Sequence, residues 1–272
     1  MITSCSNNRV KQIVQWQRSS RDRQEAGVFL TEGFKMFEEV PADSVREVYL
    51  SQDAYSRVCM EAPLREKLER TGWEIVSDEV FRKMSDTRAP QGILLVAGQP
   101  HYSPEQLFDV QCPLLVILEN IQDPGNLGTI IRTGEGAGIT GVIMSGQTVD
   151  LFNPKTIRAT MGSVFRVPFL YAESLAEVMK KLHGKGIHTY AAHLEGKECY
   201  DGYSYREGTA FLIGNEGNGL CRETTELAER HVKIPMEGRV ESLNAAVSAS
   251  ILMYEAYRQR RKGGGAAAWR LG

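Results

Sequence analysis

Three segments in the second half of the chain hold the residue types best suited to chemistry. They cover residues 120–138, 211–220 and 234–249. Each joins a short apolar run, typical of a strand, to a polar loop with glycines and then to a stretch typical of a helix. Backbone N–H groups at the start of a helix have no partner within it, so they are free to hold a ligand. The three segments therefore predict an enzyme with a small-molecule cofactor.

The first segment places polar side chains where a helix is expected to begin. Pro124 and Gly125 predict a turn after a strand. Asn126 is then expected to cap the helix, and Arg132 to lie within its first two turns. Glycines at 128, 134, 136 and 138 indicate the close approach of another backbone or of a ligand, and tight helix packing explains them equally well. Asn126 and Arg132 favour a ligand, because placing an asparagine and an arginine together at the opening of a loop costs free energy unless they bind a partner.

The second segment sets three glycines and a carboxylate directly after an apolar strand. It lacks the Gly-x-Gly-x-x-Gly fingerprint of dinucleotide-binding proteins, and the chain has no Gly-Lys-Ser/Thr phosphate loop. A plain turn would not need Asn215, Glu216 and Asn218 together. The carboxylate of Glu216 could complement a cationic cofactor or accept a hydrogen bond from a substrate hydroxyl.

The third segment is expected to open the last helix of the chain. Ser242 is predicted to cap this helix, which would run from Leu243 to about residue 262. An apolar stripe favours a structural role for much of the helix, and small residues at 245, 246, 248, 249 and 250 would let another element pack closely. The stripe consists of Val247, Ile251 and Tyr254. Asn244, in the first turn, is either an ordinary exposed polar residue or a group that faces a ligand.

The elements around these segments predict two α/β domains, since 272 residues exceed one usual core. Residues 1–98 alternate helix and strand patterns, beginning with an amphipathic helix over 9–23. Prolines at 100, 104 and 113 predict a linker over 99–113. Further strand patterns lie at 114–119, 141–144, 164–168, 189–192, 209–213 and 231–234. Helix patterns between most of them predict a mostly parallel sheet covered by helices over residues 114–262, and residues 263–272 are predicted to be a flexible tail.

Composition excludes several classes of protein. The net charge of −2 gives no overall attraction for nucleic acid, so RNA binding would need a local basic face. The five cysteines form no Cys-x-x-Cys pair and the five histidines form no His-Glu-x-x-His pair, so neither a disulfide framework nor a metal site is expected. The first 20 residues lack the apolar core of a signal peptide, and no apolar run is long enough for a membrane span. A cytoplasmic protein without a membrane role is the simple interpretation.

The three segments resemble, in order and spacing, the three motifs of the SpoU (TrmH) family of RNA ribose 2′-O-methyltransferases in the SPOUT class. The resemblance covers about residues 114–260 and includes an Asn-Pro-Lys stretch at 153–155. Residues 28–35 and 85–92 are similar to the ribosomal-protein-like substrate-binding domain of the family. One motif would be weak support, whereas three in order with the auxiliary domain are strong.

The resemblance implies S-adenosylmethionine as methyl donor, a C-terminal domain with a deep trefoil knot, and a homodimer with the active site at its interface. By motif position, the implied catalytic residues are Asn126, Arg132, Glu216 and Asn244. The implied cofactor-binding residues are Gly214, Asn215, Ile234, Met236, Ser242 and Leu243. Gly125 departs from the family pattern, where many members have a larger polar residue, which puts only local RNA contacts in doubt.

Methyl transfer from a sulfonium needs no metal, and holding the ribose oxygen in line with the S–CH₃ bond supplies most of the acceleration. A guanidinium keeps its proton in proteins, so we expect Arg132 to clamp a phosphate and stabilise the developing alkoxide. The substrate is expected to be ribosomal RNA, recruited by residues 1–98 through Arg18, Arg21 and Arg23. Alternatives are a transfer RNA methyltransferase, a non-catalytic RNA-binding member and a nucleotide-dependent α/β enzyme. The small-residue face around Ala249 is expected in or beside the dimer contact.

Overall fold

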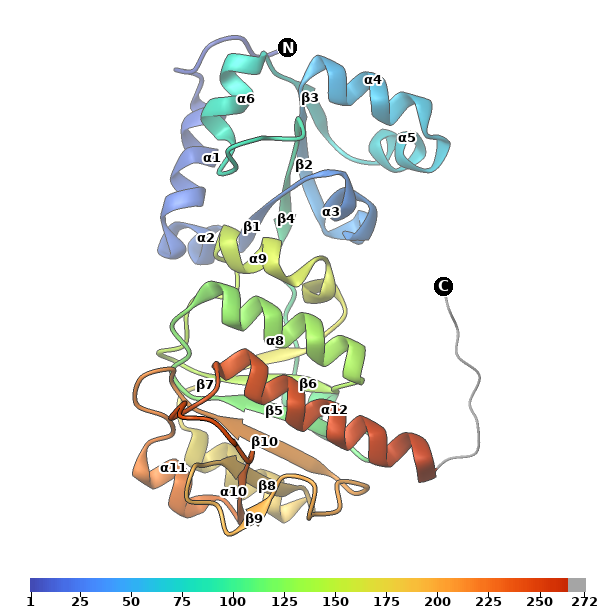
Figure 1. Cartoon of the computed structure of the whole chain (residues 1–272). Helices are drawn as coiled ribbons and strands as arrows, with labels where there is room; N and C mark the ends of the chain where they lie inside the picture. The colour runs from blue at the N-terminus through green and yellow to red at the C-terminus, as the bar shows by residue number, and fades with distance from the viewer. Residues whose placement is uncertain (264–272) are drawn as a thin grey trace. The chain divides into compact units, whose positions relative to one another are not determined.

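The computed structural model describes residues 1–263, with side chains through residue 261, so the predicted tail lies outside the described residues from residue 264 onward. Contacts divide the chain into two units (Figure 1). The first unit comprises Met1–His101 and Asp150–Phe165, and the second comprises Tyr102–Val149 and the chain from Arg166 onward. The segment from Asp150 to Phe165 therefore makes its contacts with the first unit, although it lies within the sequence of the second.

A four-stranded sheet in the order β1-β4-β2-β3 forms the centre of the first unit. Its strands are β1 (Val28–Glu32), β2 (Val45–Leu50), β3 (Trp73–Ile75) and β4 (Ile93–Gly98). The strand β4 pairs antiparallel with β1 and β2, and β2 pairs parallel with β3. The helices are α1 (Asn8–Arg18), α2 (Ser20–Ala26), α3 (Phe34–Glu39), α4 (Gln52–Met60), α5 (Ala62–Glu69) and α6 (Asp78–Met84). Apolar residues of α1 and α6, such as Ile13 and Phe81, pack with Leu30 and Leu94 of the sheet.

Two predicted elements of this unit are wrong in detail. The predicted helix over 9–23 is two helices, because Ser19 has an extended backbone and its Oγ accepts a hydrogen bond from the N–H of Asp22 at 3.2 Å, which caps α2. The predicted strand over 164–168 is also wrong. A 3-10 turn, Ser163–Phe165, occupies its start, and the following strand begins only at Phe169.

The segment from Asp150 to Phe165 packs against β1 through apolar and charged contacts. It contains α9 (Pro154–Thr160), which contacts β1. The ring centroids of Phe152 and Phe165 lie 5.1 and 5.9 Å from that of Phe29. Arg23 forms an ion pair with Asp150 and is only 2% exposed. The prediction that Arg23 contacts RNA is therefore wrong, because its guanidinium is buried in this contact.

A seven-stranded sheet in the order β7-β6-β5-β10-β8-β11-β9 forms the second unit, and every pairing in it is parallel. The predicted parallel sheet is confirmed. Its strands are β5 (Leu114–Leu118), β6 (Gly141–Ser145), β7 (Phe169–Ala172), β8 (His188–Ala192), β9 (Glu198–Cys199), β10 (Thr209–Ile213) and β11 (Arg230–Lys233). The helices are α7 (Pro104–Phe108), α8 (Pro124–Ala137), α10 (Leu175–Gly184), α11 (Arg222–Leu227) and α12 (Ala245–Gly263).

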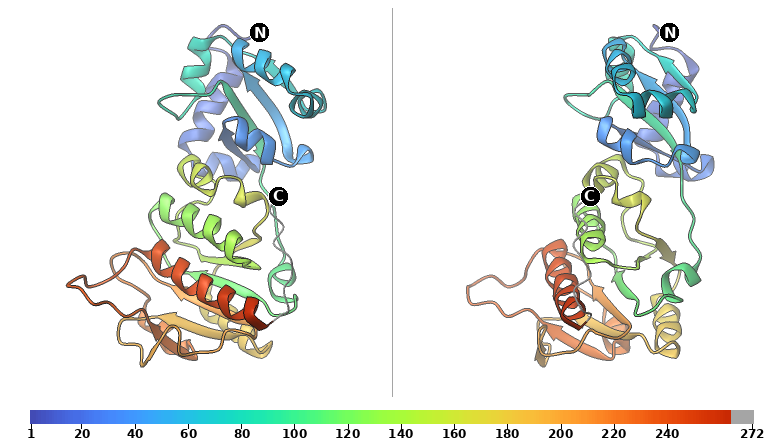
Figure 2. Two further views of the ribbon diagram at one scale, coloured as in Figure 1. Left: turned by 45° about the vertical axis from the view of Figure 1, so that its right-hand side comes forward. Right: turned by 90° about the vertical axis from the view of Figure 1, so that its right-hand side faces the viewer.

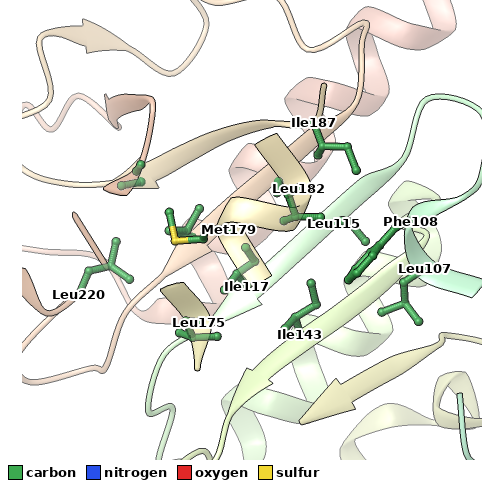
Figure 3. Close-up of a cluster of buried hydrophobic side chains, with 14 residues drawn as sticks. Leu107, Phe108, Leu115, Ile117, Ile143, Leu175, Met179, Leu182, Ile187 and Leu220 are labelled. Atoms are coloured by element: carbon green, nitrogen blue, oxygen red, sulfur yellow. The ribbon is translucent and has the colours of Figure 1, made fainter. Parts of the chain in front are cut away.

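Helices cover both faces of this sheet (Figure 2). On one face α10 sets Met179 and Leu182 over Leu115 and Ile117, and Phe108 of α7 joins the same core (Figure 3). The helix α7 lies within the predicted linker, where the sequence argued against helix. It forms because Pro104 occupies the first turn, which needs no N–H, and because the Ser103 capping box starts it.

On the other face α8 and α12 pack against each other. Gly134 permits this contact, since a Cβ there would lie 2.4 Å from Ile139 Cδ1 and 3.3 Å from Met253 Sδ. Tight helix packing therefore explains this glycine. None of the helices within residues 1–263 combines the length and the apolar character that crossing a membrane requires.

Candidate active site

A cavity of about 650 Å³ opens at the carboxyl ends of the central strands of the second unit. Because these strands are parallel, the loops that follow them meet at one edge of the sheet, where α/β proteins bind ligands. The cavity is lined by residues after β8, after β10 and after β11, and by the start of α12. All six predicted cofactor-binding residues line it: Gly214, Asn215, Ile234, Met236, Ser242 and Leu243. The structure thus brings them together, and their binding role stays a prediction.

Gly214 turns the chain sharply after β10. A Cβ at this position would lie 2.1 Å from the carbonyl carbon of Gly219 and from the nitrogen of Leu220, so only glycine fits. The loop folds back on itself, because the N–H of Asn215 donates to the oxygen of Gly219 at 3.0 Å and the N–H of Gly219 donates back at 2.9 Å. The cavity wall after β10 is therefore a tightly closed loop.

Asn215 connects this loop to the first motif. Its Oδ1 accepts hydrogen bonds from the N–H groups of Gly217 at 2.8 Å and Asn218 at 3.1 Å. Its Nδ2 donates to the carbonyl oxygen of Asn120 at 2.8 Å. The side-chain amide of Asn215 therefore fixes the shape of the loop after β10 and holds that loop against the first motif.

A directed chain of hydrogen bonds joins Glu216, Asn126 and Asn244. Asn126 Nδ2 donates to Glu216 Oε1 at 2.8 Å, and Asn244 Nδ2 donates to Asn126 Oδ1 at 2.9 Å. A carboxylate only accepts, so it must face the amino group of Asn126, which turns the carbonyl of that amide toward Asn244. Asn244 Oδ1 in turn accepts from the N–H groups of Ala246 and Val247 at the start of α12, at 2.9 and 3.3 Å. The carboxylate of Glu216 at one end of these hydrogen bonds and the N–H groups of α12 at the other therefore fix the orientation of both side-chain amides.

The two predicted helix caps are wrong, and the correct caps are neighbouring residues. The helix α8 is capped by Asp123, whose Oδ1 accepts from the N–H of Asn126 at 2.8 Å. The helix α12 begins at Ala245, so Asn244, and not Ser242, is its cap. Asn126 therefore has its side chain free for the chain of hydrogen bonds, and Ser242 lines the cavity.

Glu216 is held as an anion. Its partial burial alone would raise its pKa, but the hydrogen bonds from Asn126 and from the N–H groups of Gln122 and Asp123 outweigh this, so its pKa lies below the ordinary value. The two N–H groups donate to the carboxylate at 3.2 and 3.3 Å. Glu216 is thus a poor general base, and its geometry is that of a group that organises the first and second motifs.

Arg132 lies apart from these three residues. It is exposed on α8 and does not line the cavity. Among residues 1–261 no hydrogen bond or ion pair holds its guanidinium, which leaves it available to an external anion. The structure therefore brings together three of the four predicted catalytic residues and leaves Arg132 facing solvent.

Asn120 is a site residue that the sequence analysis did not single out. Its φ of 57° is in the left-handed region, which asparagine tolerates better than most residues. Its Oδ1 accepts from Ser145 Oγ at 2.8 Å, its N–H donates to the same Oγ at 2.9 Å, and its carbonyl accepts from Asn215. The only signal in the sequence was an asparagine at the end of a predicted strand.

The turn after β8 was also missed as a cavity wall. His193, Leu194 and Glu195 line the cavity, and the rings of His193 and His231 lie 5.9 Å apart. This turn could have been found, because β8 was predicted to lie in the same parallel sheet as β10. Within the described residues no group of three His, Cys, Asp or Glu side chains could hold a metal ion.

The apolar stripe of α12 is exposed at Val247 and Tyr254 and partly buried at Ile251. Val247 and Tyr254 are 47% and 45% exposed, whereas Ala249 is fully buried within the unit. The helix α8 and the sheet cover that side of α12, so Ala249 itself is not on the surface, and the expectation that the small-residue face lies in or beside a dimer contact stays a prediction. The opposite face carries large apolar groups in contact with solvent.

Comparisons with known proteins agree with this arrangement. The model of the SpoU rRNA methylase family matches residues 113–254, and that of the MRM3-like substrate binding domain matches residues 7–95. The chain is 32% identical to the 23S rRNA (guanosine(2553)-2′-O)-methyltransferase RlmP of Bacillus subtilis, over 93% of this chain and 97% of that protein.

Two solved structures have the same fold over almost their whole length. One is the SpoU methyltransferase AviRb from Streptomyces viridochromogenes in complex with AdoMet, with a TM-score of 0.84 and 28% identity, over 93% of this chain and 98% of that one. The other is the AdoMet-bound rRNA methyltransferase from Sinorhizobium meliloti, with a TM-score of 0.82 and 31% identity, over 94% and 97% of the two chains.

Proposed function

Because the chain belongs to the SpoU rRNA methylase family, we propose that it transfers the methyl group of S-adenosylmethionine to a ribose 2′-hydroxyl of ribosomal RNA. The observation that carries this proposal is the cavity at the strand ends, which is built from the second and third motifs and braced by the first. RlmP supports 23S ribosomal RNA as the substrate class, because it is similar over almost the whole chain.

The cavity fits S-adenosylmethionine better than a phosphate-bearing cofactor. Its lining residues include the acidic residues Glu195, Glu216 and Glu241 and, among the described residues, no lysine or arginine. Such a lining favours a sulfonium cation and repels phosphate groups. Gly214, Asn215, Ile234, Met236, Ser242 and Leu243 would hold the cofactor, which supplies an electrophilic methyl group when bound.

The protein residues divide into positioning and substrate-contacting groups. Glu216, Asn126 and Asn244 hold the three motif loops in one arrangement through their directed hydrogen bonds. Arg132, on the exposed side of α8, would bind an RNA phosphate and stabilise the oxygen that forms as the 2′-hydroxyl loses its proton. Water or the phosphate would accept that proton.

We propose a homodimer in which the exposed stripe of α12 meets a second copy of the chain. The stripe is formed by Val247, Ile251 and Tyr254. Val247 and Tyr254, at its two ends, are 47% and 45% exposed, and Ile251 between them is partly buried. Arg132 is exposed on the neighbouring helix α8, so the same contact would bring it toward the second copy.

The proposed trefoil knot rests on the resemblance of the motifs and on the strand order, in which β10 lies between β5 and β8.

The first unit is proposed to recruit the RNA, in keeping with the match to a substrate-binding domain. Arg18 and Arg21 are exposed there and could contact phosphates, although Arg21 also pairs with Glu25 at 2.7 Å.

A ribosomal RNA substrate and five free cysteines are compatible with the proposed cytoplasmic location.

Mapping ribose methylation in a strain that lacks the gene tests the proposed function. We expect one 2′-O-methyl mark to disappear from the large-subunit ribosomal RNA and to return with the wild-type gene. Loss of a mark from transfer RNA alone would contradict the proposed substrate, and an unchanged methylation pattern in all RNA would contradict the activity.

A further inference from the structure

The charge of the cofactor cavity is not balanced within the protein. Glu195 lies in the turn after β8, and Glu241 lies just before the start of α12. Within residues 1–261 the carboxylates of both are without a hydrogen bond or an ion pair, unlike Glu216, whose oxygens accept from three groups. Lys197 and Arg239 are their nearest cations in the sequence, and neither lines the cavity. Two residues with free carboxylates therefore line the space that the ligand would occupy.

Methyl transfer changes the charge of the ligand by one. The methyl carbon leaves sulfur and bonds to the ribose oxygen, the electron pair of the broken S–C bond stays on sulfur, and the hydroxyl proton is released. The sulfonium thereby becomes a neutral thioether. The ammonium and carboxylate groups of the amino-acid part are the same before and after the reaction, so donor and product differ by one positive charge at sulfur.

Resting on the proposed function, we propose that Glu195 and Glu241 make the cavity select the sulfonium donor over the thioether product. A positive charge gains Coulomb energy beside unpaired carboxylates, whereas a neutral sulfur does not. Both side chains are exposed, so screening by water limits each to an effect of about a few-fold in affinity. The selection favours exchange of product for donor after each turnover.

Calorimetric titration of the full chain with three ligands tests this proposal. The ligands are S-adenosylmethionine, S-adenosylhomocysteine and sinefungin, whose amine carries a positive charge near the sulfonium position. In the Glu195→Gln, Glu241→Gln double variant we expect the affinity for the two cationic ligands to fall about three- to tenfold, and that for the neutral product to stay within about twofold. In the wild type, about 0.5 M salt should reduce the preference for the cationic ligands.

Glu237→Gln is the matched control, because Glu237 is exposed on the same loop as Glu241 and does not line the cavity. It should leave all three affinities unchanged. Equal weakening of all three ligands in the double variant would show a loss of shape and would overturn the proposal, as would an unchanged preference. Equal affinity of the wild type for all three would contradict the charge selection alone, whereas no binding of any of them would contradict the proposed function as well.

Discussion

Asn126 is held on both sides of its amide group, by Glu216 and by Asn244. The motifs in the sequence were sufficient to predict that these three side chains belong to one site. They were not sufficient to predict the order of donors and acceptors, because that order depends on a carboxylate at one end and on helix N–H groups at the other. Asn120 was missed because its left-handed backbone is set by its contacts with Ser145 and Asn215.

Replacing Arg132 with lysine should separate binding from turnover. Lysine keeps the charge but lacks the planar fork that matches a phosphate. We expect the rate of methyl transfer to fall about a hundredfold with saturating RNA, while the affinity for S-adenosylmethionine stays unchanged. Single-turnover methylation and calorimetry measure the two quantities. Arg222→Lys, an exposed arginine paired with Glu226, is the control, and near-normal turnover in Arg132→Lys would exclude a role for the fork.

Glu216→Gln should damage both cofactor binding and turnover. Glutamine has one acceptor oxygen in place of two, and its amino group would face the donors that the carboxylate now accepts. The loops after β5 and β10 would lose their common anchor. Calorimetry and methylation assays of this variant check the expectation. A variant that binds the cofactor normally and loses only turnover would point to direct participation of Glu216 in the reaction.

The pH dependence of stability gives an independent test of the same carboxylate. Because the pKa of Glu216 is lowered in the folded protein, its ionised form stabilises the fold above the ordinary glutamate pKa, about 4.3, and this contribution is lost as the pH falls through the lower folded pKa. The difference in unfolding free energy between wild type and Glu216→Gln should therefore be present at neutral pH and shrink below about pH 4. Denaturant titrations that show a constant difference would contradict this.

At the scale of elements, apolar runs identified the central strands β5 and β10, because all five residues of each are buried. The edge strands β7 and β9 are only partly buried, so the first was misplaced and the second was not predicted. The sequence was less informative about caps and faces. The helix α7 and the break between α1 and α2 depend on single serine caps. The orientation of α12 was not evident, since small residues and large apolar residues are both compatible with a buried face, and the structure buries the alanines at 245, 246 and 249.

Val247→Glu should dissociate the proposed dimer without unfolding the protomer. Val247 is 47% exposed in the first turn of α12, where a carboxylate is compatible with the helix dipole. A buried charge at a two-fold contact would face its own copy. Light scattering should show a dimer for the wild type and for the control Met60→Glu, at an 84% exposed position in the first unit, and a monomer for Val247→Glu. A monomeric, active wild type would contradict the dimer.

At the scale of the whole molecule, the least predictable feature is the segment from Asp150 to Phe165, which contacts the first unit although the chain enters and leaves it from the second. Alternation of strands and helices placed these residues in the second domain. Nothing in their spacing reveals that Phe152 and Phe165 pack on Phe29, since such contacts join residues more than a hundred positions apart.

Asp150→Asn tests how strongly this segment stabilises the first unit. The change leaves the buried guanidinium of Arg23 without a charged partner, which should lower the free energy of unfolding by about 3 kcal/mol. Denaturant unfolding of the full chain measures the loss. Asp53→Asn, in the first turn of α4 and without an ion pair among the described residues, is the control and should change little. Equal stability of both variants would show that the pair contributes nothing.

The central claim, that the chain methylates ribose in ribosomal RNA, is tested most directly by one transfer experiment. Purified protein is incubated with isotopically labelled S-adenosylmethionine and total RNA from a strain that lacks the gene, and the labelled nucleoside is identified by mass spectrometry. We predict label on a ribose 2′-oxygen of the large-subunit ribosomal RNA with the wild type and almost none with Arg132→Lys. Label on a base, label in transfer RNA alone, or no transfer by the wild type would contradict the claim.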